Sequence, residues 1–345
     1  MQKPFFSIII PAYNLENYIA AALQSVLVQT FQDFEIIIVD DGSSDETVSI
    51  IQSFHDPRIH LVSQVNGGVS RARNAGMKKA VGAYIAFLDG DDYWYPEHLE
   101  LAADFFNRHP EILVYANRYM RDELEAIPPR PPSYPESIRR LGIRGVLFMH
   151  PSSVILNSSL ASRLPPWEEA MPYGEDGLYW TRCMRGTGLI GLGGSVTSIY
   201  RQRASSAMHD EHYQHVSLHS LIAPLLNELE AMKNPKWQFA VHYLVIRELH
   251  PKRLLSLNAE ERISLTGRIR KIMHPCLNRL VLDSYMKACS ARAGMEQSFS
   301  ALMDRTMFSC KWLDRLERMG RSLFFRLQTN NGMESKHQDP VRSRS

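Results

Sequence analysis

The sequence predicts an α/β fold in which a mostly parallel β-sheet is flanked by helices and is followed by a helical C-terminal extension. In the first 120 residues, short apolar runs rich in β-branched residues alternate with longer amphipathic stretches. This strand and helix order is typical of a parallel sheet with helices on both faces. From about residue 211 onward the strand patterns disappear and only helical periodicity remains.

The elements of the N-terminal half follow in order, because polar or glycine-containing turns bound each apolar run. Ligands of such a sheet bind beyond the carboxyl ends of its strands, so the loops after the strands are where functional residues are expected. We expect strands at residues 5–10, 34–39, 58–62 and 83–88, and helices at residues 17–29, 45–54 and 70–80.

A proline-rich segment at residues 127–135, with five prolines in nine residues, interrupts this pattern and separates off a looser portion. Beyond it we expect strands at residues 146–150 and 189–196, a helix at residues 175–185, and further helices at residues 213–232 and 237–249.

Three parts of the chain follow from these elements. Residues 1–206 form a first domain that contains all the expected strands, and residues 207–328 form a helical C-terminal region. Residues 329–345 lack apolar periodicity, which predicts a disordered tail.

Composition excludes several classes of protein. Apolar residues make up 44% and charged residues 22% of the 345 residues, as in ordinary globular proteins. The formal net charge of +2 is too small to indicate nucleic-acid binding, so we expect no nucleic-acid partner. The four cysteines show no C-x-x-C spacing, and no apolar stretch near Met1 resembles a signal peptide. We therefore expect a cytoplasmic protein.

Acidic residues follow two of the expected strands. Asp40 to Asp45 follows the second strand and Asp89-Gly90-Asp91-Asp92 follows the fourth. Carboxylates gathered at one sheet edge repel one another, and a divalent cation relieves that repulsion. Mg²⁺ and Mn²⁺ prefer such oxygen ligands, which favours Asp89 and Asp91 as metal ligands. The alternative is a set of turns and helix caps, above all for the first cluster, and Asp92 could simply orient its loop.

A basic loop lies between these acidic segments. Residues 66–76 read NGGVSRARNAG and place Arg71 and Arg73 in the first turn of a helix. A helix start favours anions, and arginine can bind a phosphate with two parallel hydrogen bonds. The alternative is a surface arginine paired with a nearby aspartate.

The order of these motifs resembles a known family. The run Ser7 to Asn14, the aspartates at residues 40–41, the loop at residues 66–76 and the sequence FLDGDD at residues 87–92 are similar to family 2 glycosyltransferases of the GT-A fold. The resemblance is specific over residues 5–120 and continues less clearly to about Ser206.

The resemblance implies a nucleotide-diphospho-sugar donor, usually a UDP-sugar. In such enzymes the loop after the first strand and the aspartate after the second hold the uracil and ribose, which here are Pro11, Tyr13 and Asp40. The D-x-D positions, Asp89 and Asp91, then bind Mn²⁺ or Mg²⁺ at the diphosphate. Arg71 matches a basic position near the diphosphate, and Arg73 is a second candidate for that contact or a structural residue.

The resemblance also implies a catalytic base. The segment PYGEDGLYWTR at residues 172–182 is similar to the family's acidic pair at a helix start, and Asp176 matches the carboxylate that activates the acceptor hydroxyl. Taken alone, Glu175-Asp176 would be an ordinary helix-start preference. A single displacement on the face opposite the diphosphate would invert the anomeric configuration. Arg201, Arg203 and His209 match a basic segment that could contact the diphosphate.

The C-terminal region adds a basic amphipathic helix at residues 311–327. It could lie peripherally on the inner face of an anionic membrane, where a lipid-linked acceptor would be presented. Its apolar stripe could equally pack on the preceding helices.

The resulting hypothesis is a metal-dependent inverting glycosyltransferase that adds a sugar to a saccharide or lipid-linked acceptor in surface polysaccharide or glycolipid synthesis. Two alternatives remain: a non-catalytic protein that binds nucleotide-sugars, and a sugar nucleotidyltransferase. A nucleotidyltransferase is expected to carry a glycine-rich basic signature near its first strand, where this chain instead has Pro11 to Asn14.

Overall fold

The computed structural model describes residues 3–122, 133, 135–139, 149–201, 218–231, 264–265, 267–269 and 271. All of them belong to the first of two units, Met1–Ile272; the second unit is Met273–Ser345. The predicted domain boundary at residue 206, the helix at residues 237–249, the amphipathic segment at residues 311–327 and the tail from residue 329 lie outside the described residues. These stay predictions.

Within the described residues the sheet has nine strands, in the order β3-β2-β1-β4-β8-β6-β9-β5 with β7 also paired to β9. The strands β1, β2, β3 and β4 are parallel, whereas β8 runs antiparallel to both β4 and β6. The strands are β1 Phe6–Ala12, β2 Phe34–Asp40, β3 Ile59–Ser63, β4 Tyr84–Phe87, β5 Tyr93–Trp94, β6 Val114–Asp122, β7 Ser137–Arg139, β8 Val154–Asn157 and β9 Ile190–Arg201.

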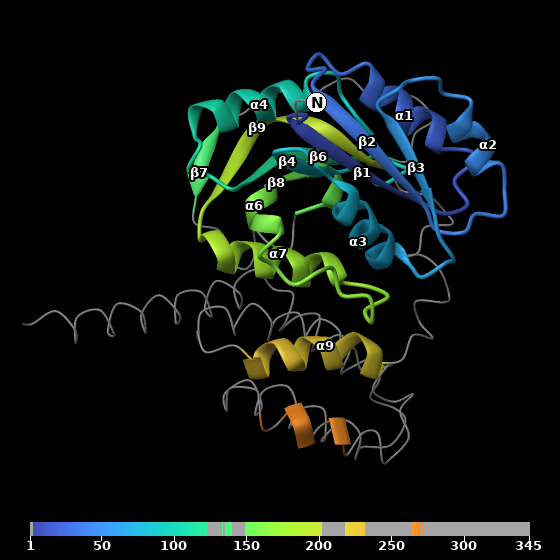
Figure 1. Cartoon of the computed structure of the whole chain (residues 1–345). Helices are drawn as coiled ribbons and strands as arrows, with labels where there is room; N and C mark the ends of the chain where they lie inside the picture. The colour runs from blue at the N-terminus through green and yellow to red at the C-terminus, as the bar shows by residue number, and fades with distance from the viewer. Residues whose placement is uncertain are drawn as a thin grey trace, which may run out of the picture. The chain divides into compact units, whose positions relative to one another are not determined.

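Helices cover both faces of this sheet (Figure 1). The helices α1, α2 and α4 lie on one face, and α3, α6 and α7 lie on the other. The described helices are α1 Ile19–Leu27, α2 Thr47–Gln52, α3 Val69–Lys79, α4 His98–Arg108, the 3₁₀ turn η1 Pro151–Ser153, α6 Ser158–Ala161, α7 Glu175–Thr187 and α9 Leu218–Ala231.

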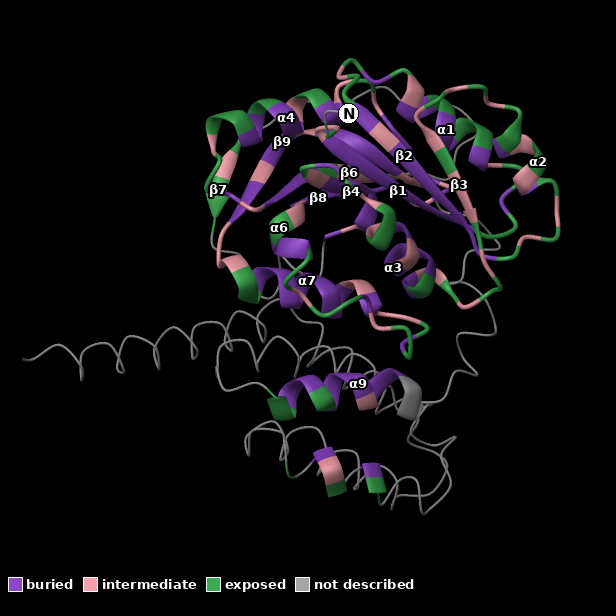
Figure 2. Ribbon diagram, viewed as in Figure 1, coloured by how far each residue is buried: buried purple, intermediate pink, exposed green. Residues whose placement is uncertain are grey.

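Successive side chains of the central strands supply two separate cores. Ile8 and Ile10 of β1 pack with the buried residues of α1, α2 and α4, whereas Ile37 and Val39 of β2 pack with Ala72 of α3 on the opposite face. The pleat of a strand sends neighbouring side chains to opposite faces, so a continuous apolar run is buried on both. Figure 2 shows the central strands and the inner sides of these helices as buried.

The register of the parallel strands aligns their carboxyl ends at one edge. Ala12 lies opposite Asp40, and Asp40 lies opposite Ser63. The amide of Leu88 donates to the Ile9 carbonyl at 3.0 Å, which continues the β4 pairing up to the residue before Asp89. The loops after β1, β2, β3 and β4 therefore leave the sheet side by side.

The parallel half agrees with the sequence prediction to within a few residues at each end. The comparisons below confirm the fold class. One local expectation is wrong: Met149 and His150 are not in a strand, because Pro151 starts the η1 turn and the strand begins only at Val154. Residues 146–148 lie outside the described part of the chain, and β5, β6, β7 and β8 had no predicted counterpart.

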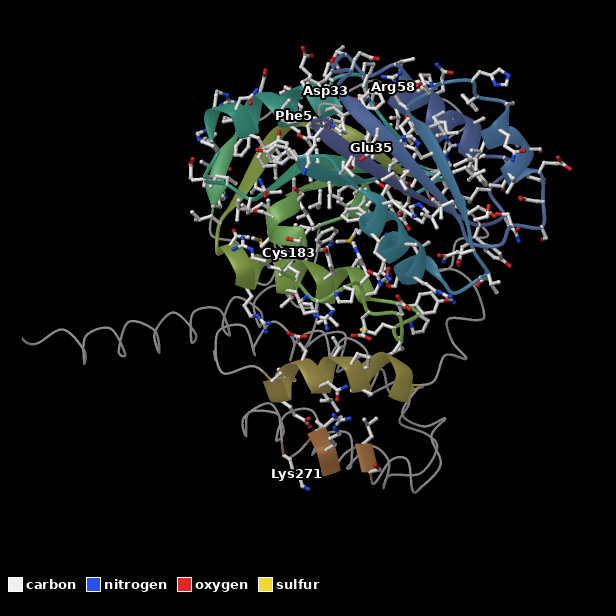
Figure 3. All side chains as sticks on the ribbon, in the orientation of Figure 1. Phe5, Asp33, Glu35, Arg58, Cys183 and Lys271 are labelled. Atoms are coloured by element: carbon white, nitrogen blue, oxygen red, sulfur yellow. The ribbon has the colours of Figure 1, made fainter. Side chains whose placement is uncertain are left out.

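The helix α9 is joined to α7 by two ion pairs of the buried residue Glu228. Glu228 is 8% exposed and accepts hydrogen bonds from Arg182 Nε and Arg185 Nη1, both at 2.9 Å. Cys183 also lies on α7 as a buried free thiol whose pKa is raised by burial (Figure 3). No helix within the described residues has the length and hydropathy needed to span a bilayer.

Gly76 provides a test of the packing between α3 and β1. A Cβ atom at this position would lie 2.5 Å from Ile9 Cγ2. Alanine gains about 1 kcal/mol of helix propensity over glycine, but overpacking typically costs about 1–3 kcal/mol. We expect Gly76→Ala to lower the free energy of unfolding, measured by urea denaturation. In an Ile9→Ala background the same change should be neutral or stabilising, and an equal loss in both backgrounds would contradict this explanation.

Candidate active site

The loops after β1 and β2 hold each other in place. Asn14 has a left-handed backbone with φ of 50°. Its amide donates to Ser43 Oγ at 3.0 Å, and its side-chain oxygen accepts from the Ser44 amide at 2.9 Å. These bonds leave the neighbouring Tyr13 side chain 48% exposed, while Asp40 is buried and accepts from the Ser43 amide at 3.0 Å. The predicted nucleoside contacts thus lie on two interlocked loops.

Asp41 organises the next loop along the edge. Its carboxylate is buried and accepts from the amides of Gly67 and Gly68 and from Gln64 Nε2, with its shortest bonds at 2.7 Å. The structure therefore adds a loop-forming role for Asp41 that the sequence analysis did not identify.

Arg71 lies in the first turn of α3 and is exposed. Its side chain passes so closely over Gly67 that a Cβ atom there would overlap Arg71 Cδ. A side chain at residue 67 would therefore displace the arginine side chain from this path. A guanidinium beside a helix start can bind an anion, as the sequence analysis expects of Arg71.

Ser152 holds the acidic loop after β4 in place by hydrogen bonds. The amide of Asp89 donates to Ser152 Oγ at 3.0 Å, and that hydroxyl donates to Asp92 Oδ2 at 2.6 Å. The second oxygen of Asp92 accepts from the Arg201 amide at 3.0 Å. Burial and the carboxylates of Asp91 and Asp89 raise the pKa of Asp92 well above its ordinary value. Asp92 therefore orients the loop, one of the roles foreseen for it.

His150 lies beside this loop. Its Nε2 is 4.0 Å from Asp89 Oδ2 and its Nδ1 is 3.5 Å from Asp92 Oδ2. Within the described residues, Asp89, Asp92 and His150 form a group whose ligand atoms all lie within 4.8 Å of one another. Crowded carboxylates beside an imidazole suit a divalent cation. The sequence analysis chose Asp91 beside Asp89 as metal ligands, and nothing in the local sequence around His150 indicates that this residue lies beside the loop after β4.

Arg73 connects the acidic loop to α7. It is 3% exposed and donates to Asp89 Oδ1 at 2.8 Å and to Glu175 Oε1 at 3.0 Å. Its guanidinium carbon lies 4.5 Å from the centre of the Trp167 ring. Of the two readings given for Arg73, this buried geometry agrees with the structural one.

Asn74, the next residue of α3, binds the segment that precedes α7. Its Nδ2 donates to the Trp167 carbonyl at 2.9 Å and to Glu169 Oε1 at 2.8 Å. Its Oδ1 accepts from the Trp167 amide at 2.9 Å. The partners are more than ninety residues away in sequence, so no local pattern could have revealed these contacts.

Glu175 and Asp176 open α7 after Gly174, whose φ is 76°. Glu175 is 9% exposed, and burial together with the charge of Asp176 raises its pKa to about 7, although Arg73 opposes the shift. Asp176 is more exposed and accepts from the Gly177 amide at 2.6 Å. Glu175, the residue before the predicted base Asp176, is linked to Asp89 through Arg73.

The predicted site residues lie at the carboxyl ends of β1 and β2 (Pro11 and Asp40), in the loops that follow β1 and β4, and in the first turns of α3 and α7. Arg201 ends β9, and its guanidinium carbon lies 5.5 Å from the Tyr18 ring centre and 5.7 Å from that of Tyr93; its contact with a phosphate stays a prediction. Arg203 and His209 lie outside the described residues. The roles assigned to the predicted site residues remain predictions, namely those of Pro11, Tyr13, Asp40, Arg71, Asp89, Asp91 and Asp176.

Solved structures share this fold. S. aureus TarS 1–349 in complex with UDP-GlcNAc has a TM-score of 0.60 and 22% identity, covering 82% of this chain and 85% of that one. The mannosyltransferase PcManGT from Pyrobaculum calidifontis, in complex with GDP-Man and Mn²⁺, has a TM-score of 0.51 and 15% identity, covering 84% and 87%. These similarities confirm the predicted α/β fold class.

Sequence relatives point to one family. The family model described as glycosyl transferase family 2 matches residues 7–162. An uncharacterized glycosyltransferase of Rickettsia prowazekii is 32% identical over 191 residues, or 53% of this chain and 59% of that protein. Another, EpsJ of Bacillus subtilis, is 49% identical over 92 residues, or 26% of this chain and 27% of that protein. This chain thus spans less than two thirds of these two relatives.

One relative is covered over most of its length. It is the UDP-Glc:alpha-D-GlcNAc-diphosphoundecaprenol beta-1,3-glucosyltransferase WfgD of Escherichia coli, 32% identical over 212 residues, or 60% of this chain and 80% of that protein. Together with the match over the strands and loops that build the site, this similarity shows that the chain belongs to glycosyl transferase family 2.

Proposed function

We propose that the chain transfers a sugar from a nucleotide-diphospho-sugar, most simply a UDP-sugar, to a saccharide or lipid-linked acceptor with inversion at the anomeric carbon. The observation that carries this proposal is the Arg73 bridge, since one buried guanidinium bonds both the acidic loop after β4 and the acidic start of α7. A transferase needs a donor-binding group and an acceptor-activating group close together. The names of the relatives support the donor and acceptor classes, since WfgD uses UDP-Glc and a diphosphoundecaprenol-linked sugar.

A divalent cation, Mn²⁺ or Mg²⁺, fits the acidic loop. The raised pKa of Asp92 reflects burial and the repulsion of Asp91 and Asp89, which a cation would relieve. We assign Asp89 and Asp91 as its ligands, with His150 and Asp92 adjacent. When bound, the cation would stabilise negative charge on the diphosphate as it leaves.

The remaining steps belong to side chains of the chain itself. Pro11, Tyr13 and Asp40 hold the nucleoside, and Arg71 at the start of α3 binds the diphosphate and stabilises its developing charge. Asp176 accepts the proton of the acceptor hydroxyl as that oxygen attacks the anomeric carbon. The carboxylate of Asp176 is partly exposed, which suits a group that has to meet an acceptor.

The biological setting proposed is surface polysaccharide or glycolipid synthesis. A chondroitin synthase of Escherichia coli, itself a polysaccharide-forming protein by name, is 42% identical over 107 residues, or 30% of this chain and 16% of that protein. Contact with a membrane through residues 311–327 belongs to the same proposal and depends on an acceptor that is lipid-linked.

A donor panel tests the function directly. Purified protein is incubated with UDP- and GDP-sugars, Mn²⁺ and candidate acceptors, and release of nucleoside diphosphate is measured. We expect release from at least one UDP-sugar, and its loss when a chelator removes the cation. Binding of UDP without any transfer would favour the non-catalytic alternative, and release of pyrophosphate from a nucleoside triphosphate would favour the nucleotidyltransferase.

The base assignment is tested by Asp176→Asn. We expect kcat to fall by about 10² to 10⁴, the usual contribution of a positioned base, with little change in UDP affinity. Calorimetry with UDP and Mn²⁺ measures the affinity, and acceptor turnover measures kcat. Equal losses in affinity and turnover would make Asp176 a donor ligand and Glu175 the next candidate.

The raised pKa of Glu175 predicts a pH-dependent stability. A carboxyl group whose pKa is higher in the folded state stabilises the fold fully below its unfolded value and loses that contribution as the pH rises through about 7. We therefore expect wild type to lose up to about 3 kcal/mol relative to Glu175→Gln between pH 4 and pH 8. Urea denaturation of both proteins at each pH measures the difference, and a pH-independent difference would contradict the shift.

A further inference from the structure

Arg73 and Asn74 occupy consecutive positions on α3 and are 3% and 4% exposed. Together they bond to both sides of the site: the loop that carries Asp89, and the segment from Trp167 to Glu175 that leads into α7. Two adjacent buried polar side chains that both bind one distant segment form a specific attachment, because a buried polar group must find its partners in a defined geometry.

Asn74 and Arg73 bind different partners. The amide of Asn74 makes three hydrogen bonds, two to the backbone of Trp167 and one to Glu169, all between 2.8 and 2.9 Å. None of these bonds involves the acidic loop. Arg73 bonds Asp89 on the donor side and Glu175 on the α7 side. A change at Asn74 therefore perturbs the α7 side alone, whereas a change at Arg73 perturbs both.

Trp167 connects this segment to α7 by aromatic packing. Its ring stacks on Tyr179 at 4.1 Å with an interplanar angle of 10°, and it meets Trp180 edge-on at 5.2 Å. Both partners lie on α7, and all three rings are fully buried. Since Asn74 fixes the Trp167 backbone and Trp167 packs against α7, the direction in which α7 begins depends on Asn74.

We propose that Arg73 and Asn74, the α3 clamp, position the start of α7 against the donor-binding loops and thereby control the rate of sugar transfer rather than the affinity for the donor. This inference rests on the proposed function, in which Asp176 at the start of α7 is the base. Neither clamp residue is catalytic; both are positioning residues. A misplacement of about 1 Å of a reacting group can cost about 10² in rate, so a clamp of this kind has a measurable effect.

The primary test is Asn74→Ala, with Asn117→Ala as a matched control. Asn117 is an equally buried asparagine that bonds Tyr115 and His98, away from the clamp. We expect Asn74→Ala to lower kcat at least about tenfold while the dissociation constant for UDP with Mn²⁺ stays within about twofold of wild type. The control should lower the melting temperature without the selective loss of kcat.

Arg73→Lys is a second variant, and it tests the same proposal if Asn74→Ala fails to fold. Lysine keeps the charge but lacks the planar fork that lets one group bond Asp89 and Glu175 together. We expect its kcat to fall by a larger factor than its UDP affinity.

Hydrogen exchange of the backbone amides of residues 166–176 tests the α3 clamp independently of the proposed transferase activity. Exchange there should be faster in Asn74→Ala than in wild type, whereas exchange in β1 and β2 should be unchanged. Unchanged exchange at residues 166–176 would overturn the clamp even if transfer is demonstrated. Unchanged kcat, a parallel loss of UDP affinity, or the same loss of kcat in Asn117→Ala would also overturn it. A wild-type protein that neither binds UDP nor releases it from any donor would instead refute the proposed function.

Discussion

The buried guanidinium of Arg73 is the interaction on which the arrangement of the site depends. Asp89 lies in the loop after β4, and Glu175 lies at the start of α7. The buried guanidinium supplies compensating positive charge to both carboxylates. Breaking a buried ion pair by removing one partner typically costs about 3–5 kcal/mol, because the remaining charge is left without compensation. Arg73 therefore links the loop after β4 directly to the start of α7, and its removal would leave the carboxylates of Asp89 and Glu175 without this compensating charge.

The acidic residues of the site then fall into two groups according to how completely their oxygens are bonded. Asp41 and Asp92 are buried, and both oxygens of each accept hydrogen bonds from the loops around them. Such carboxylates shape loops. Asp89 and Asp176 retain partial exposure, which leaves surface for a ligand. Neighbouring aspartates in one motif thus serve different purposes, and the difference comes from burial rather than from the motif.

The sequence predicts the parallel half of the sheet well because its signals are local. Continuous β-branched runs such as Ile8 to Ile10 mark strands that are buried on both faces, and parallel strands place their carboxyl ends at one edge whatever the details of packing. The strands β6 and β8, which are antiparallel to each other, are separated in sequence by residues 123–153, and neither carries a comparable run of β-branched residues. Their place in the sheet follows from pairing with β4 and β9, which no local pattern encodes.

The same distinction applies within the site. Tyr13, Asp40, Arg71 and Asp89 follow strands or begin a helix, so their positions can be inferred from the fold class. Asn74, Ser152 and His150 act through partners that are 58 to 95 residues away, and their side chains alone do not indicate which partner they meet. A single sequence can therefore predict which loops meet at the edge of the sheet, but not which side chains hold those loops in register.

Support for α7 also comes from beyond the sheet. Glu228 of α9 binds Arg182 and Arg185 in the second half of α7, while Arg73 binds Glu175 at its first residue. The helix that carries the predicted base is thus held by ion pairs near both ends, from α3 on one side and from α9 on the other. Because a helix is stiff along its length, constraints at its two ends fix the direction of its axis as well as its position. The orientation of Asp176 therefore depends on a residue more than fifty positions further along the chain, in a helix that contributes no side chain to the proposed donor site.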